Sequence, residues 1–184
     1  AFYARLAKEA GMKYAVLTAK HHEGFCLFDS ALTDYKSVNT PIGRDLVREF
    51  VDAFRKEGLR VGIYYSLVDW HHPDYPAYGD PFHPSRSNAS SQNEKCDFNR
   101  YLDYMHAQVK ELCTNYGKLD LFWFDFSYEG HSGADWRAME LVNLVRSLQP
   151  NILINSRLEA SGGSLGSLLT ESPTPWAGDF VTPE

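Results

Sequence analysis

The chain has 184 residues and a formal net charge of −6, and it is 43% hydrophobic and 23% charged. This is the composition of an ordinary globular domain, and the acidic balance gives no basic surface for nucleic acid or an anionic membrane. Three cysteines without a Cys-x-x-Cys pair indicate neither a disulfide framework nor a zinc site, no apolar run is long enough to span a membrane, and no signal peptide is visible.

Segments of strand character alternate with segments of helical character along the chain. The helical segments carry apolar residues at three- and four-residue steps, whereas the strand segments are short continuous apolar runs. Gly58, Gly117 and Pro150 close three of the helical segments. In chain order the sequence predicts a helix over 1–10, a strand at 14–19, a helix over 46–56, a strand at 60–66, a helix over 98–112, a strand at 119–126, a helix over 141–148, a strand at 151–156 and a possible fifth strand at 178–182.

This alternation favours a parallel sheet whose strands are joined by crossover helices. We expect an α/β fold in which the strands form part of a (β/α)₈ TIM-like barrel and the helices form its outer ring. A complete barrel needs roughly 250 residues. Residues 1–184 are therefore interpreted as a single, incomplete catalytic barrel domain, truncated at both ends and without a second domain.

The strand at 119–126 is the most informative segment, because its buried apolar run ends on the carboxylate of Asp125. Successive strand side chains alternate between faces, so Leu121, Trp123 and Asp125 share one face. An indole one step below a carboxylate is the arrangement expected of a sugar-binding wall beneath a nucleophile. A lone aspartate at a strand end is more often a cap, but three other strand segments also run into polar residues. Such residues at C-terminal strand ends build the active site of a (β/α)₈ barrel.

Five motifs follow one another at these strand ends. They are Lys20-His21-His22-Glu23-Gly24-Phe25, Tyr64-Tyr65-Ser66 followed by Asp69-Trp70-His71, Trp123-Phe124-Asp125, Asn155-Ser156-Arg157, and Gly178-Asp179-Phe180-Val181-Thr182-Pro183-Glu184. In this order the set resembles the α-L-fucosidases of glycoside hydrolase family 29. The resemblance implies a (β/α)₈-like barrel without a metal or cofactor. It also implies hydrolysis of terminal α-L-fucose from fucosylated oligosaccharides or glycoconjugates, with retention of anomeric configuration.

The resemblance further implies two catalytic carboxyl groups. Asp125 matches the nucleophile of the family, which attacks the anomeric carbon. Glu184 matches the commonest candidate for the acid/base, and Glu171, in the glycine-rich stretch that precedes it, is a rival for that role.

Sugar-binding residues are implied in the same way. His21 and His22 match paired histidines that hydrogen-bond fucose hydroxyls, and Trp123 matches a residue that lines the fucose pocket. Arg157 matches an arginine that reaches the sugar or a neighbouring carboxylate. Tyr64 matches the strand tyrosine near the nucleophile, with Tyr65 as the alternative occupant of that place.

The chain departs from the family pattern at two positions, with Glu23 where many members have Asp and Phe126 where Gly is common. A noncatalytic fucose-binding descendant of the barrel and a metal-dependent barrel hydrolase are the alternative functions. A metal at the His21–His22 pair ranks behind sugar binding, because adjacent strand residues point to opposite faces. The isolated chain is expected not to turn over substrate, and linkage preference, oligomeric state and compartment are not predicted. Three further histidines, His83, His106 and His131, are expected to face solvent.

Overall fold

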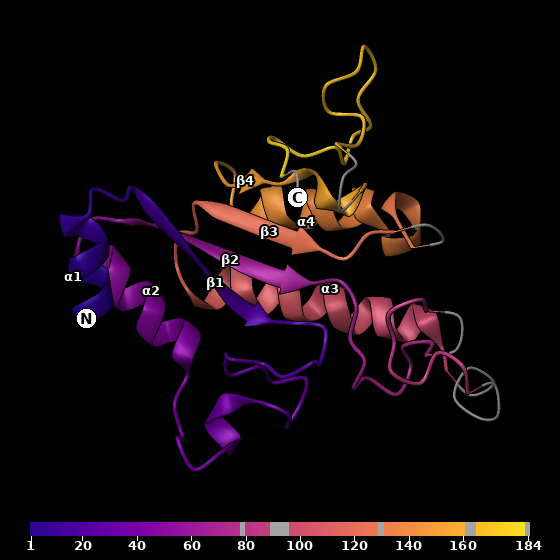
Figure 1. Cartoon of the computed structure of the whole chain (residues 1–184), viewed down its shortest axis with the longest axis horizontal. Coiled ribbons are helices and arrows are strands. Elements are labelled where there is room, and N and C mark those ends of the chain that lie inside the picture. The colour runs from indigo at the N-terminus through magenta and orange to yellow at the C-terminus, as the bar shows by residue number, and fades with distance from the viewer. Residues whose placement is uncertain (78–79, 89–95, 129–130, 161–164, 183–184) are drawn as a thin grey trace.

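A computed structural model describes residues 1–77, 80–88, 96–128, 131–160 and 165–182 (Figure 1). Four parallel strands pair in the order in which they occur in the chain, β1-β2-β3-β4. Within the described ranges, no helix combines the length and the apolar character required to cross a bilayer. The elements are α1 (Phe2–Glu9), β1 (Tyr14–Lys20), η1 (Ser37–Asn39), α2 (Leu46–Lys56), β2 (Arg60–Ser66), α3 (Phe98–Asn115), β3 (Leu121–Asp125), η2 (Gly133–Trp136), α4 (Ala138–Leu148), β4 (Leu153–Ile154) and η3 (Ser156–Leu158).

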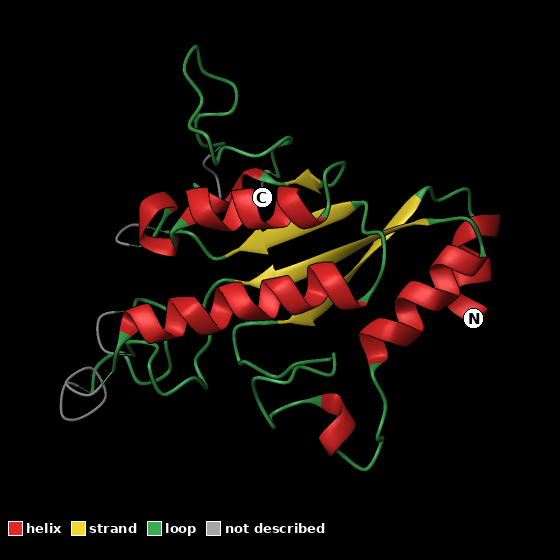
Figure 2. Ribbon diagram, turned by 180° about the vertical axis from the view of Figure 1, so that it is seen from behind, coloured by secondary structure: helices red, strands yellow, loops and turns green. Residues whose placement is uncertain are grey.

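The helices cover one face of the sheet. Figure 2 shows α3 and α4 lying along that face, and α2 packs against β1 and β2. Alternate strand residues such as Ile63, Tyr65, Phe122 and Phe124 point to the helices and are fully buried. Sequential parallel strands with crossover helices on one face are the unit of a (β/α)₈ barrel, so the predicted fold class is confirmed.

The opposite face of the sheet carries the side chains that the sequence predicts for the functional site. Tyr64 pairs in register with Trp123, and Ser66 pairs with Asp125. The strand alternation that buries Phe122 and Phe124 under the helices therefore leaves Trp123 and Asp125 together on the other face. The predicted sharing of one face by these two residues is confirmed.

Strand β4 is shorter than predicted, and a side chain continues its pairing. Only Leu153–Ile154 pair with β3 as a strand. Beyond them, the Asn155 amide nitrogen donates to the Phe124 carbonyl and its amide oxygen accepts from the Phe124 N–H, both at 2.9 Å. The predicted fifth strand at 178–182 is wrong for the described residues of that segment, because Phe180 forms only an isolated parallel bridge with Asn155. One bridge is too short a pairing to count as a strand.

Candidate active site

Asp125 lies at the C-terminal end of β3 with both carboxylate oxygens engaged. The Tyr64 hydroxyl donates to Oδ2 at 2.7 Å, and the Arg157 guanidinium donates to Oδ1 at 2.6 Å. The Arg157 side chain is 3% exposed and that of Asp125 15% exposed, so this ion pair is largely shielded from water. Arg157 is fixed in turn by Thr182, whose hydroxyl and carbonyl oxygens accept from it at 2.7 and 2.8 Å. The carboxylate is therefore held in one orientation from two sides.

The two adjacent tyrosines of β2 have separate surroundings. Tyr64 faces Asp125, whereas Tyr65 is fully buried on the helix side and donates to Gln108 of α3 at 2.7 Å. Burial raises the pKa of Tyr65 well above its usual value. Of the two tyrosines that the sequence left open, Tyr64 is the one beside the carboxylate.

Trp123 lies one step below Asp125 on the same face. The guanidinium carbon of Arg157 is 5.9 Å from the centroid of its ring, and the ring of Phe180 meets it in a T-shaped arrangement. The indole Nε1 is buried and has no hydrogen-bond partner among the described residues. The indole is thus packed as an apolar wall, and it also carries a free donor.

His21 and His22 lie side by side, contrary to the expectation that they point to opposite faces. The strand ends at Lys20, so alternation no longer applies, and the two imidazole centroids are 4.1 Å apart. His21 stacks on Tyr64 at 5.6 Å, and His22 stacks on Trp70 at 3.9 Å. Burial and the neighbouring His21 lower the pKa of His22, and Glu23 opposes this shift. A neutral imidazole has one donor and one acceptor, which suits a sugar hydroxyl.

The same two histidines and Glu23 are the one group within the described ranges whose spacing would suit a metal ion, with ligand atoms within 4.8 Å of one another. Nδ1 of His21 is 3.5 Å, and Nδ1 of His22 is 3.7 Å, from a Glu23 carboxylate oxygen. Two imidazoles and a carboxylate form a ligand set that zinc accepts. The geometric reason given above against a metal here is therefore wrong, and the expectation of a metal-free site stays a prediction.

A fully buried ion pair joins Lys20, at the end of β1, to Asp69, in the loop after β2. The register of β1 shifts between Thr18 and Lys20, so the Lys20 side chain turns to the helix side of the sheet. There its Nζ donates to Asp69 Oδ2 at 3.1 Å, with side-chain exposures of 0% and 2%. The other oxygen, Asp69 Oδ1, accepts from the backbone N–H groups of His71 and His72 at 3.0 Å each.

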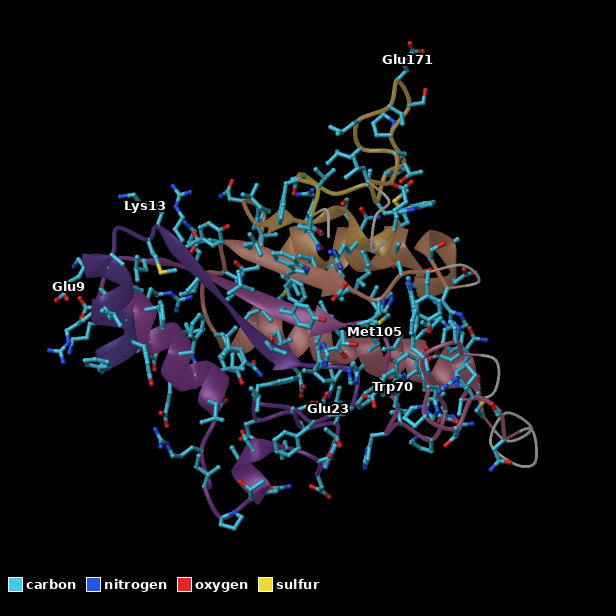
Figure 3. The ribbon with its side chains drawn as sticks, in the orientation of Figure 1. Glu9, Lys13, Glu23, Trp70, Met105 and Glu171 are labelled. Carbon is cyan, nitrogen blue, oxygen red and sulfur yellow. The ribbon has the colours of Figure 1, made fainter. Side chains whose placement is uncertain are left out.

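This pair joins the loop after β2 to the end of β1. A Cβ atom at Gly24 would lie 2.2 Å from Asp69 Oδ1, which explains a glycine at this point of the motif. The Trp70 N–H donates to the His22 carbonyl at 2.7 Å across the same junction. Figure 3 shows Glu23 and Trp70 beyond the C-terminal ends of β1 and β2. Sequence patterns did not single out Lys20, because nothing in them signals the bulge that buries it.

The structure describes only one of the two candidates for the acid/base. Glu184 lies outside the described residues. Glu171 is exposed at the tip of a loop that projects away from the sheet (Figure 3). Glu171 therefore lies away from the C-terminal end of β3, where Asp125 is found.

A parallel β/α array with charged residues at the C-terminal ends of its strands defines part of a TIM-barrel catalytic domain. The sequence model described as Alpha-L-fucosidase matches residues 1–171, and the chain therefore belongs to the α-L-fucosidase family. This agrees with the resemblance found in the motifs.

Individual relatives give the same result. The chain is similar to Alpha-L-fucosidase isoenzyme 1 from Paenibacillus thiaminolyticus, with 63% identity and a TM-score of 0.93 over 99% of this chain and 42% of that one. It is also similar to an α-L-fucosidase of Lactobacillus casei solved in complex with Fuca(1,6)GlcNAc, with 32% identity and a TM-score of 0.74 over 95% of this chain and 57% of that one. A Putative alpha-L-fucosidase 1 of Oryza sativa subsp. japonica is 33% identical over 84% of this chain and 26% of its own length. The chain thus spans about a quarter to somewhat over half of these relatives.

Proposed function

We propose that the protein carrying this chain is a retaining exo-glycosidase that hydrolyses terminal α-L-fucose from fucosylated oligosaccharides or glycoconjugates. The observation that carries the proposal is the engagement of Asp125 by Tyr64 and Arg157 at the end of β3, in a chain of the α-L-fucosidase family. The relative bound to Fuca(1,6)GlcNAc supports a fucosylated glycan as the substrate class.

The proposed reaction is a double displacement. An Asp125 oxygen attacks the anomeric carbon of fucose while an acid donates a proton to the departing glycosidic oxygen, which gives a fucosyl ester and a free alcohol. The conjugate base of that acid then takes a proton from water, and the water oxygen attacks the same carbon and releases fucose and Asp125. Two inversions at one carbon retain the configuration.

We assign the acid/base role to Glu184. Thr182 accepts hydrogen bonds from Arg157, and Arg157 donates to Asp125, so the chain two residues before Glu184 is linked to the nucleophile through one arginine side chain. Two residues span at most roughly 7 Å, so Glu184 follows closely on a residue whose contacts lead through Arg157 to Asp125. Retaining glycosidases need roughly 5–5.5 Å between the two carboxyl groups. Glu171 has no comparable tether to Asp125 among the described contacts.

The sugar would contact the remaining predicted residues from two directions. The His21–His22 pair supplies imidazole nitrogens at the end of β1, and Trp123 supplies an apolar indole face on β3. Polar groups on one side and an aromatic surface on the other match a sugar, whose hydroxyls and C–H groups lie on different faces. Arg157 donates hydrogen bonds to Asp125 and Thr182, and we therefore assign it the role of orienting the nucleophile.

The test is hydrolysis of an aryl α-L-fucoside by the full-length protein, alongside a panel of other aryl glycosides. Asp125→Asn is expected to lower kcat by at least about 10³-fold, whereas Asp52→Asn, at an exposed position on α2, should leave it unchanged. NMR spectra recorded during hydrolysis should show α-L-fucose as the anomer that is released first. Release of the β anomer would contradict retention, and a folded protein that binds fucose without hydrolysing any glycoside would be the noncatalytic descendant.

A further inference from the structure

Phe126, directly after Asp125, has an unusual backbone conformation. Its φ is +76°, and only one other non-glycine residue among those described, Arg137, has a positive φ. This left-handed region is unfavourable for a bulky L-residue and is normally left to glycine. Phe126 therefore stands in a strained conformation beside the carboxylate, and such strain points to a functional constraint.

The conformation changes the face on which the aromatic ring lies. If the extended strand continued, residue 126 would point with Phe122 and Phe124 towards the helices. Instead, its ring contacts both histidines of the site. The ring centroid is 5.4 Å from that of His21 at an interplanar angle of 69°, and 5.5 Å from that of His22 at 77°. Both are edge-to-face arrangements, which aromatic pairs favour.

The backbone on each side of Phe126 is held by other contacts. The Asp125 carbonyl accepts from the Leu67 N–H at 3.0 Å, which ties the end of β3 to β2. The buried Ser127 hydroxyl donates to the Leu158 carbonyl at 3.1 Å and accepts from the Trp136 indole N–H at 3.1 Å. Because both neighbours are held, the backbone of Phe126 is constrained to the left-handed conformation.

With Phe126 in place, each imidazole is packed between two aromatic rings. His21 has Tyr64 on one side and Phe126 on another, and His22 has Trp70 and Phe126. Without the Phe126 ring, each imidazole would lose one of these neighbours and gain rotational freedom. A ligand would then have to order both rings on binding, which lowers affinity.

We propose that Phe126 is a positioning residue, whose ring fixes the imidazoles of His21 and His22 in the orientation that binds the sugar. The proposal rests on the function proposed above. It explains why a strained phenylalanine stands where glycine would meet the backbone requirement without strain.

The test separates the ring from the backbone. Phe126→Gly and Phe126→Asn both tolerate a positive φ, so each relieves strain and removes the ring. In the full-length protein we expect KM for an aryl α-L-fucoside to rise by about tenfold or more, which corresponds to roughly 1.4 kcal/mol, with a smaller change in kcat and a Tm equal to or above that of the parent. Phe126→Tyr, which keeps the ring, should retain the parental KM.

Arg137→Gly is the matched control, because it places glycine at the other left-handed position, φ +49°, before α4. It should leave KM unchanged. An unchanged KM in folded Phe126→Gly and Phe126→Asn overturns the positioning role, as does a rise in KM that Phe126→Tyr shares in full.

A readout without substrate keeps this proposal separate from the proposed function. The imidazole proton signals of His21 and His22 in NMR spectra should move in Phe126→Gly, because the ring current of Phe126 is lost. Signals that stay in place refute the positioning role even if the parent hydrolyses fucosides. If the parent protein hydrolyses no fucoside but the imidazole signals move in Phe126→Gly, the proposed function is refuted and the packing role of Phe126 stands.

Discussion

Replacing Lys20 by methionine tests the buried ion pair between Lys20 and Asp69. Met keeps the length and apolar stem of the side chain but removes the ammonium group that Asp69 accepts from. Removing one partner of a buried pair costs about 3–5 kcal/mol, because an uncompensated charge is left behind. The contact of the ammonium with the Tyr65 ring, 4.5 Å from its centroid, is lost as well.

The lower end of that range applies here. Asp69 keeps two backbone donors, from His71 and His72, after Lys20 is replaced. We therefore expect the free energy of unfolding to fall by about 3 kcal/mol. By contrast, Lys8→Met breaks a surface pair with Glu57, whose side chains are 57% and 21% exposed, and should cost about 1 kcal/mol or less.

Urea unfolding of the full-length variants, followed by tryptophan fluorescence, gives these values. A double-mutant cycle with Asp69→Asn measures the pairing itself, and we expect a coupling of roughly 1–3 kcal/mol. If Lys20→Met costs no more than Lys8→Met, or if the two substitutions at the buried pair add independently, the reasoning about desolvation is refuted.

Three further outcomes are expected. Tyr64→Phe removes a charge-assisted hydrogen bond to Asp125 worth about 1.5–3 kcal/mol, so kcat/KM should fall by about 10- to 100-fold; exposed Tyr14→Phe is the control, and equal activities of the two variants would argue against the contact. Chelation should leave fucosidase activity unchanged, and loss of activity restored by zinc would instead assign a metal to His21, His22 and Glu23. Burial lowers the pKa of five histidines below the ordinary 6.5, so at mildly acidic pH the unfolded chain binds protons that the folded chain does not. The urea concentration at the midpoint of unfolding should therefore fall as the pH is lowered from about 7 through these lowered pKa values. A midpoint that stays constant or rises would contradict this sign. The five are His22, His72, His83, His106 and His131.

Local patterns in the sequence predict most of the fold. Helical spacing followed by Gly58 and Gly117 predicts α2 and α3, because both residues take the positive φ that ends a helix. Strand alternation likewise predicts which residues of β3 face the site. These features depend on neighbours within a few positions, and for that reason a single sequence reveals them.

Features that depend on distant partners are missed. The bulge that buries Lys20 arises from the register of β1 against β2, and the left-handed Phe126 from contacts on both sides of it. The expectation that His83 faces solvent is wrong, since it is 5% exposed. No local pattern distinguishes such residues from ordinary strand or loop positions.

The early end of β4 has a consequence for variation among relatives. The Asn155 side chain pairs with the Phe124 backbone, and Phe180 forms a bridge with Asn155. The segment that leaves β4 and the segment that returns to it therefore meet at Asn155. Doubling the length of a flexible loop between fixed ends costs only about 0.6 kcal/mol. The tip of this connection, residues 168–173, can therefore lengthen, shorten or be exchanged in descendants without moving Arg157 or Thr182, because Ser167 and Thr174 on either side of it are held by Glu159. The surface formed by this loop can thus vary among relatives while Asp125 and Arg157 keep their positions.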